Sequence, residues 1–415
     1  GAMGFVSFLE GINTLQKNGF VNIDAMKKIK STRSLENISV SHSHNLENNV
    51  ITSRYCTEVL LGSFSGEKIE IKNKLQVLGD SMVLTQGVDK LRVHIHTNYP
   101  DKVVSLLKKD GKILEQKAED MIRQEQVVNS KKGEIAVLTD SIADIPRDLL
   151  DKYQVHLVNI KLLWGEDEYI DRVTITSEQF YKEQELRKEF PGSSLPSEAD
   201  IDTIYRYLLD HYSGVIVLPV GKQLSGTWNI MTKVAEKVDP IHNKICVIDT
   251  CLNSVAQGLL VQEVAKKAVS GSSLFELRDF ANSLKSKIKI YVSVNTFKYM
   301  VKGGRVSPLK GFIASALNLK PIVSLDSNGK GTVMGKAFSR KGLIKQITKI
   351  VSSTNANKGI RSFALVHADD LEGSNVFSNR ISRILNKNPD YITSISSIVG
   401  MHSGKGAIAI GIIEA

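Results

Sequence analysis

The sequence predicts an α/β protein in which a small α+β domain precedes a larger, two-lobed domain. The length of 415 residues is nearly three times a typical domain of about 150 residues, so more than one core is expected. A hydrophobic fraction of 42% with 24% charged residues is typical of globular chains. From residue 134 onwards, apolar strand-like runs alternate with helical patterns. We therefore expect three segments, at 1–49, 50–130 and 134–415.

The first two segments differ in pattern. Apolar residues recur at helical spacing early in 1–49, and a Ser/Asn/His-rich linker follows them. In 50–130 we expect strands at 50–62, 81–88 and 91–98, a helix around 75–80, and a helix that opens at 99–101. The stretch 106–126 interleaves lysine with glutamate and aspartate, which is the pattern of solvated helices.

The third segment has the order of a parallel sheet with helices on both faces. A helix is expected near Pro146, and the strands of this sheet are expected within 134–140, 211–221, 245–250 and 288–294. After about residue 316 the pattern changes. A hairpin with a glycine-containing turn is expected in 321–340, with further strands in 363–370 and 395–413. The last third should form a smaller mixed lobe, with a cleft between the lobes.

Charge and cysteine content exclude several classes of protein. The net charge is +10, but basic and acidic residues are interleaved and no nucleic-acid-binding motif is present, so no nucleic-acid partner is expected. No apolar stretch approaches the roughly 20 residues that cross a bilayer, and the first residues lack a signal-peptide pattern, so a cytoplasmic location is expected. An odd set of three cysteines, Cys56, Cys246 and Cys251, argues for reduced thiols or a metal ligand.

Four short segments carry candidate ligand-binding residues. Ser193 and Ser194 precede a helix for which Ser197 is the expected cap. Ser225, Gly226 and Thr227 follow a predicted strand, where hydroxyls and free helix-end amides suit an anion, although Ser225 could equally be only a helix cap. Arg305 follows two glycines in a predicted turn, and His402 lies at a predicted glycine-lined turn between strands.

Taken together and in order, these segments resemble the DegV family over residues 134–415. The matching segments are Asp140-Ser141, Ser193-Ser194-Leu195-Pro196-Ser197, Leu224-Ser225-Gly226-Thr227, Gly303-Gly304-Arg305 and His402-Ser403-Gly404-Lys405-Gly406-Ala407. The resemblance implies a long-chain fatty acid as ligand. It implies that Ser193, Ser194, Ser225 and His402 hold the carboxylate, and that Arg305 lies near the mouth of the site. The sequence departs from the family pattern at Ser193, Leu195 and Lys405, which bears on the head-group contacts and the chain length.

A second resemblance covers residues 50–130. The segments 55–58, 78–81 and 93–98 are similar to the middle domain of the catalytic component of fatty acid kinase, which is related to dihydroxyacetone kinases. His94 and His96 are two apart on a strand and share a face, and Cys56 comes from a strand that could pair beside it. Such a pair can simply line a polar strand face. The resemblance implies that Cys56, His94 and His96 are zinc ligands.

The two resemblances together imply a function. Residues 4–15 look like the last helix of a kinase domain, so 1–49 is expected to be the remnant of that domain and its linker within a longer fusion. The chain would bind a long-chain fatty acid and present its carboxylate to a kinase domain that holds Mg-ATP, without being an enzyme by itself. A homodimer and a peripheral membrane contact are further expectations. The alternative is a zinc-dependent hydrolase centred on Cys56, His94 and His96, with Glu58 or Asp80 as general base.

Overall fold

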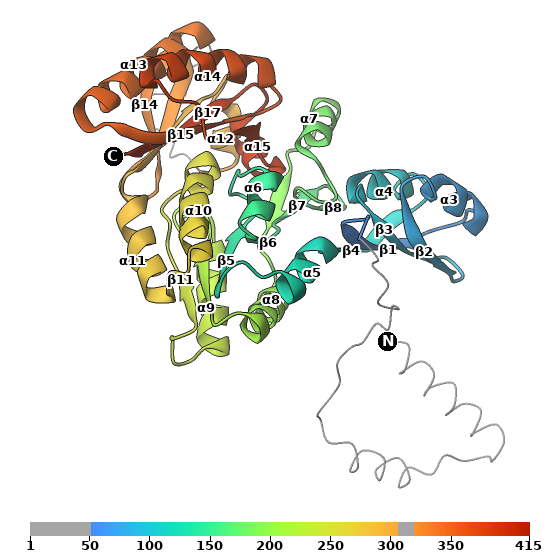
Figure 1. Cartoon of the computed structure of the whole chain (residues 1–415). Coiled ribbons are helices and arrows are strands. Elements are labelled where there is room, and N and C mark those ends of the chain that lie inside the picture. Colours follow the sequence, from blue (N-terminus) through green and yellow to red (C-terminus); the bar gives the residue numbers. More distant parts are fainter. Residues whose placement is uncertain (1–50, 306–318) are drawn as a thin grey trace, which may run out of the picture. The chain divides into compact units, whose positions relative to one another are not determined.

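The computed structural model describes residues 51–305 and 319–415 (Figure 1). The helix and linker predicted in 1–49 lie outside the described residues. Within the described ranges, none of the helices has the length and apolar character needed to cross a lipid bilayer.

The first described domain is a four-stranded antiparallel sheet in the order β2-β3-β1-β4. Its elements are β1 (Tyr55–Gly62), α3 (Lys68–Leu75), β2 (Gly79–Gln86), β3 (Leu91–Thr97), α4 (Pro100–Leu107), β4 (Lys112–Asp120) and α5 (Met121–Asn129). Strand β1 alternates buried residues such as Val59 with partly exposed ones such as Cys56 and Glu58. Helices α3 and α4 pack on the buried face, so the other face carries the polar side chains.

Two local predictions in this domain are wrong. The helix expected around 75–80 lies earlier in the chain, because α3 ends at Leu75 and β2 already begins at Gly79. The charged stretch 106–126 is not all helical, because Lys112–Asp120 forms β4. Strand β4 is an edge strand, and charged side chains on an edge strand disfavour further strand pairing. An edge strand need not show the apolar alternation on which the prediction relied.

The second domain begins with a four-stranded parallel sheet in the order β11-β10-β5-β6. Its strands are β5 (Ile135–Asp140), β6 (His156–Val158), β10 (Gly214–Leu218) and β11 (Ile245–Val247). Helices α8 (Glu198–His211) and α9 (Thr227–Val238) cover one face through Leu138 and Val217, and α10 (Ser254–Val269) and α11 (Leu274–Lys285) cover the other (Figure 1). Helix α6 (Arg147–Lys152) begins directly after Pro146, as predicted.

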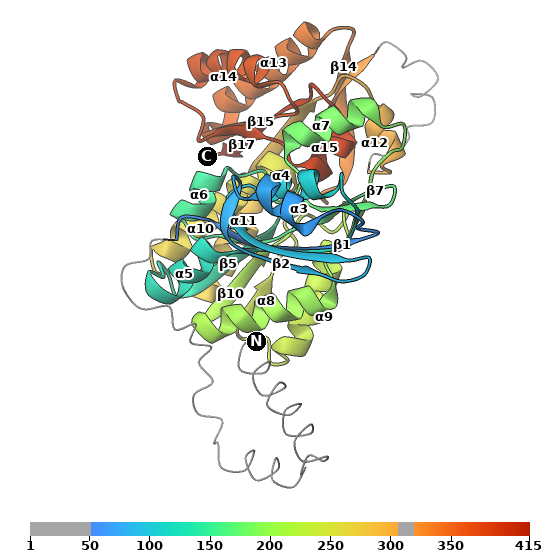
Figure 2. The ribbon, with the colours of Figure 1, turned by 90° about the vertical axis from the view of Figure 1, so that its right-hand side faces the viewer.

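The last lobe is a six-stranded mixed sheet in the order β14-β13-β12-β17-β15-β16. Its elements are β12 (Ile288–Ser293), α12 (Lys298–Lys302), β13 (Lys320–Leu325), β14 (Gly331–Ala337), α13 (Arg340–Lys358), β15 (Ile360–His367), α14 (Leu371–Leu385), β16 (Ile392–Ser394), α15 (Ser397–Ser403) and β17 (Ile408–Glu414). Helices α13 and α14 cover one face of this sheet (Figure 2). The fold class predicted from the sequence is confirmed.

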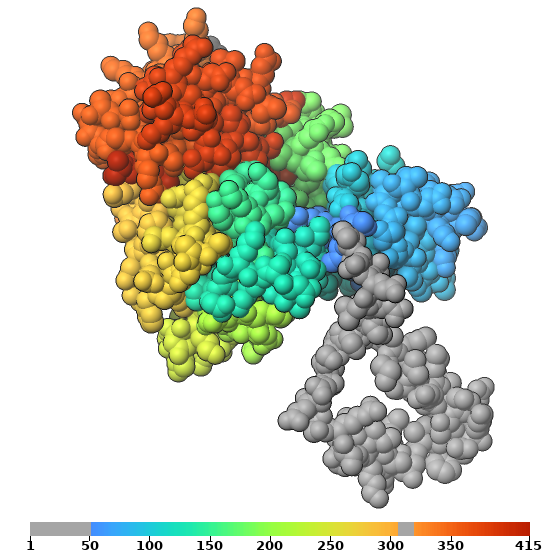
Figure 3. Space-filling view, viewed as in Figure 1, coloured from blue at the N-terminus to red at the C-terminus, as the bar shows by residue number. Residues whose placement is uncertain are grey.

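Helix α10 lies between the two sheets. It contacts β5 of the parallel sheet and β12, β15 and β17 of the six-stranded sheet. Twelve of its 16 residues are buried, because a helix covered on both sides has no solvent face. The two lobes are therefore in direct contact, as the space-filling view shows for the yellow and green atoms against the orange and red ones (Figure 3).

The structure corrects two further predictions. Strand β12 was expected in the parallel sheet, but it pairs antiparallel with β13 and β17 in the other sheet. His402 was expected in a turn between strands, but it lies in the last turn of α15. The glycines that follow end this helix, and Gly404 and Gly406 have φ angles of 74° and 79°, which favour glycine.

Candidate functional site

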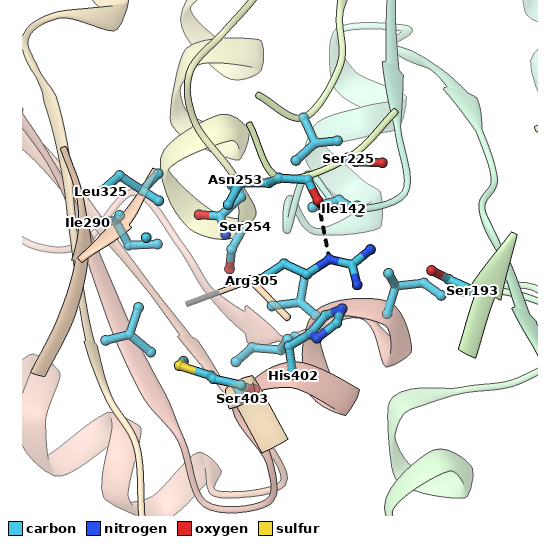
Figure 4. A pocket seen from close by; sticks show the side chains of 18 of the residues that line it. Ile142, Ser193, Ser225, Asn253, Ser254, Ile290, Arg305, Leu325, His402 and Ser403 are labelled. Carbon is cyan, nitrogen blue, oxygen red and sulfur yellow. Dashed lines mark hydrogen bonds between the residues drawn. The ribbon is translucent and has the colours of Figure 1, made fainter. Parts of the chain in front are cut away.

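A cavity of about 350 Å³ lies between the two lobes (Figure 4). Its size is at the lower end of the range of roughly 300–1,000 Å³ for small-molecule sites. One wall comes from the carboxyl edge of the parallel sheet, where open α/β sheets commonly bind ligands. The other comes from the six-stranded sheet. Most of the lining is apolar, including Ile142, Ile160, Val220, Leu224, Ile290, Val292, Met300, Val323, Leu325, Ile395, Ile398, Val399 and Ala409.

Three of the predicted hydroxyl groups line this cavity. Ser193 and Ser194 lie in β9 (Gly192–Ser194), which belongs to a small antiparallel sheet with β7 (Lys161–Trp164) and β8 (Asp167–Ile170). Ser225 and Gly226 lie in the loop between β10 and α9 and also line the cavity. The structure thus brings together residues that are about 30 positions apart in sequence.

Thr227 and Ser197, which are close in sequence to these serines, do not line the cavity. Thr227 is fully buried outside the lining, and its Oγ1 lies 2.8 Å from Ser225 Oγ. Ser225 Oγ also accepts a hydrogen bond from the Thr227 backbone N–H at 3.3 Å, so it both faces the cavity and helps to begin α9. Ser197 Oγ accepts from the Asp200 backbone N–H at 3.0 Å, which confirms its predicted role as the cap of α8.

His402 presents an imidazole to the same cavity. Its Nδ1 atom is buried and has no hydrogen-bond partner among the described residues. Burial, together with the positive charge of Arg305, lowers the pKa of His402 to about 4, so the imidazole is neutral at pH 7. Its position depends on Gly303, because a Cβ atom at that residue would lie 1.9 Å from Nδ1.

Arg305 lies across the cavity from one lobe to the other (Figure 4). Its Nε donates to the Leu224 carbonyl at 3.3 Å, and its Nη1 donates to the Gly303 carbonyl at 2.5 Å. The side chain is exposed, so the guanidinium can contact both solvent and a bound anion.

Sequence reasoning missed four polar residues of the lining, namely Asn253, Ser254, Ser324 and Ser403. Asn253 and Ser254 follow β11 and begin α10, so their place at the carboxyl edge could have been inferred from the strand order. Ser324 lies inside a strand and Ser403 at the end of α15, and no motif marks Ser324.

A second group of polar residues lies in the first domain. Cys56, His94 and His96 each place a ligand atom within 4.8 Å of the others, on the face of the sheet that the helices leave open. Cys56 Sγ lies 3.8 Å from His94 Nδ1. Carboxylates are close by, with Glu58 Oε1 3.4 Å from His94 Nδ1 and Asp80 Oδ1 3.8 Å from His96 Nδ1. Burial and the carboxylates of Glu119 and Glu58 raise the pKa of the Cys56 thiol.

Comparison with known proteins decides the family. Residues 134–415 match the family model described as an uncharacterised protein of the DegV family. The chain belongs to the DegV family. A DegV domain-containing protein of Clostridium acetobutylicum is 31% identical over 284 residues, which cover 68% of this chain and 99% of that protein.

Solved structures of DegV proteins share the fold. A protein from Streptococcus agalactiae, described as a fatty acid binding DegV family protein, matches with a TM-score of 0.62 and 26% identity and covers 68% of this chain and 99% of its own. DegV from Bacillus subtilis, described as a fatty acid binding protein, matches with a TM-score of 0.61 and 25% identity over 68% of this chain and 100% of its own. Residues 52–128 match a family model for the middle domain of proteins like fatty acid kinase. Both predicted resemblances are confirmed.

Buried carboxylates support the cavity of this DegV-family chain. Asp144 is fully buried, and it accepts hydrogen bonds from Ser254 Oγ at 2.5 Å and from the Ser396 backbone N–H at 2.8 Å. These bonds join the start of α10 to the start of α15, the helix that carries His402. Asp140, the last residue of β5, accepts from the Val220 backbone N–H at 2.8 Å. Burial raises the pKa of both carboxyl groups to about 6.

Proposed function

We propose that the chain binds a long-chain fatty acid, with the carboxylate at Ser193, Ser194, Ser225 and His402 and the acyl chain in the apolar part of the cavity. The observation that carries the proposal is one cavity that combines these polar groups with a mostly apolar lining. The description of the Streptococcus agalactiae and Bacillus subtilis relatives as fatty acid binding proteins supports it.

The physical chemistry of the cavity suits such a ligand. Each buried methylene contributes about 0.8 kcal/mol, so a C16 chain contributes on the order of 10 kcal/mol before its loss of conformational freedom is counted. The carboxylate needs hydrogen-bond donors, because an unpaired buried anion costs several kcal/mol. Serine hydroxyls, the exposed guanidinium of Arg305 and the N–H of a neutral His402 can supply them.

A lipid extraction experiment tests this proposal. Protein purified from cells fed with oleate is expected to carry a fatty acid, and Ser225→Ala is expected to lower the amount retained severalfold, because one hydroxyl donor is lost. Mass spectrometry of the extracted lipid measures both. Ser197→Ala is the matched control, since Ser197 caps α8 and does not line the cavity. Protein without any bound lipid after feeding would contradict the proposal.

We infer that the bound fatty acid is presented to an ATP-dependent kinase domain, which transfers the γ-phosphoryl group of ATP to the carboxylate and releases ADP. The match of residues 52–128 to a fatty acid kinase middle domain supports this. The oleate-loaded protein should then yield hydroxylamine-trappable acyl phosphate only when Mg-ATP and such a kinase domain are added. The predicted homodimer, membrane contact and cytoplasmic location stay predictions.

We also propose that Cys56, His94 and His96 hold a zinc ion. Zinc–ligand bonds of about 2.0–2.3 Å place tetrahedral ligand atoms about 3.5 Å apart, and the three atoms found here lie within 4.8 Å of one another. Glu58 or Asp80 could complete the site. A bound zinc ion would supply a fixed positive charge that stabilises a Cys56 thiolate. The comparisons give no support to the zinc-dependent hydrolase considered from the sequence.

Metal analysis checks the zinc proposal. The purified protein is expected to contain about one zinc per chain, and Cys56→Ser should lower that content at least tenfold, because a hydroxyl is a far poorer zinc ligand than a thiolate. Cys246→Ser is the control, since Cys246 lies outside the cluster. Equal metal content in the two variants would count against the site.

A further inference from the structure

Asn253 places an unpartnered amide in the wall of the cavity. It is the last residue before α10 and lines the cavity. Its Oδ1 atom is buried and accepts no hydrogen bond from the described residues. The side chain does not cap the helix either. Buried polar groups in native proteins almost always have a partner, so the Oδ1 atom of Asn253 is open to a hydrogen-bond donor within the cavity, which is either a group of a ligand or a water molecule.

Other polar groups nearby are already engaged. Ser254 Oγ donates to Asp144, and Ser324 Oγ donates to the Ile290 carbonyl at 2.6 Å. Ser403 is only 4% exposed and lines the cavity, and its hydroxyl interacts with the buried hydroxyl of Tyr181. The Oδ1 atom of Asn253 and the imidazole of His402 are thus the lining groups that point to a partner inside the cavity.

The position of Asn253 separates it from the groups proposed for the carboxylate. In Figure 4, Asn253 is drawn between the apolar residues Ile290 and Leu325 on one side and Ser225 and Ser193 on the other. An acyl chain that runs from the serines towards Ile290 and Leu325 would pass this amide. The group that meets Asn253 would therefore belong to the chain of the ligand.

The chemistry of the amide narrows the class of ligand. A carboxamide presents one acceptor and an NH₂ donor, whichever way it is turned. An ionised carboxylate has no hydrogen to donate, so it would leave the amide oxygen unsatisfied. A methylene satisfies neither group. A hydroxyl both donates and accepts, and it can satisfy both.

We propose that the cavity is adapted to long-chain fatty acids that carry a hydroxyl group on the acyl chain, and that Asn253 binds this hydroxyl. This inference rests on the proposed function, because it concerns the same cavity and the same class of lipid. It makes Asn253 a residue that determines specificity, while the serines and His402 hold the carboxylate.

A competition experiment tests the inference. Stearate and a set of monohydroxystearates, with the hydroxyl at different carbons, displace a fluorescent fatty-acid analogue from the full chain. At least one hydroxystearate is expected to bind about tenfold more tightly than stearate, since an unsatisfied buried polar group gains its partner. Asn253→Leu, which keeps a similar volume, should remove this preference, so that the hydroxystearates and stearate bind with similar affinity. Ser324→Ala is the matched control, because the Ser324 hydroxyl is already bonded to Ile290 and should not affect the preference.

The outcomes separate this inference from the function on which it rests. If stearate binds and every hydroxystearate binds equally or more weakly, the inference is wrong and the proposed function stands. If Asn253→Leu weakens all ligands to the same extent, Asn253 contacts the carboxylate and the inference is also wrong. If no fatty acid displaces the analogue from the unmodified protein, the proposed function itself fails.

Discussion

Replacing Arg172 with methionine is expected to lower the free energy of unfolding by about 3–5 kcal/mol, which is the usual cost of leaving a buried charge without its partner. Arg172 forms an ion pair with Asp144, whose side chain is fully buried, and its Nε donates to the Ser141 carbonyl at 2.8 Å. Asp171, also fully buried, accepts a hydrogen bond from the Ser397 backbone N–H at 2.9 Å and interacts electrostatically with Arg172. Urea unfolding of the variant and the unmodified protein measures the difference.

A second variant shows whether the loss comes from the ion pair. In Arg172→Met/Asp144→Asn, the buried charge of Asp144 is removed together with its partner. This double variant should be more stable than the sum of the two single changes predicts, since residues in one network are not additive. If Arg172→Met alone lowers the free energy of unfolding by less than about 1 kcal/mol, the ion pair between Arg172 and Asp144 contributes little to stability.

Replacing Gly303 with alanine is expected to weaken fatty acid binding by about 10- to 100-fold, because His402 must leave its place. The new Cβ would lie 1.9 Å from His402 Nδ1 and 2.4 Å from Cε1, far inside contact distance. The φ angle of Gly303 is −79°, which alanine adopts readily, so the backbone itself is not strained. The effect should therefore fall on the imidazole. Displacement of a fluorescent fatty-acid analogue measures the affinity.

Gly192→Ala is the matched control for this variant. Gly192 is the neighbour of Ser193, and a Cβ atom there would meet nothing within 4 Å. Its affinity should equal that of the unmodified protein. His402→Ala should reproduce the loss seen for Gly303→Ala. If both His402→Ala and Gly303→Ala bind normally, the imidazole does not hold the carboxylate.

Topology predicts one part of the site, around Ser225, and the other candidate residues come from the resemblance of the motifs to the DegV family. Ser225 comes after β10, and the carboxyl ends of parallel strands meet at one edge, so its approach to other loops follows from topology. The structure places Ser193, Arg305 and His402 on the same cavity. The helix that carries His402 was missed, since α15 is only 7 residues long and its apolar residues resemble those of a strand.

Other features could not be predicted, because they depend on which surfaces pack together. Nothing local in residues 288–293 tells whether β12 pairs in the first sheet or the second, since both positions bury apolar residues. Asn253 is similar in this respect. An asparagine before a helix is a common cap, and only the structure shows that its amide makes no cap bond and faces the cavity instead.

The burial of α10 determines how a ligand can reach the cavity. Pulling the lobes apart would expose the face of α10 that packs on the six-stranded sheet, including Val255 and Leu259 against Gly411 of β17, each of which contributes about 1.5–3 kcal/mol when buried. It would also break the hydrogen bonds from Gln262 Nε2 to Asp390 and from the Ser396 backbone N–H to Asp144. We therefore expect the lobes to stay together while a ligand enters or leaves, so that only small local rearrangements at the entrance of the cavity let it pass.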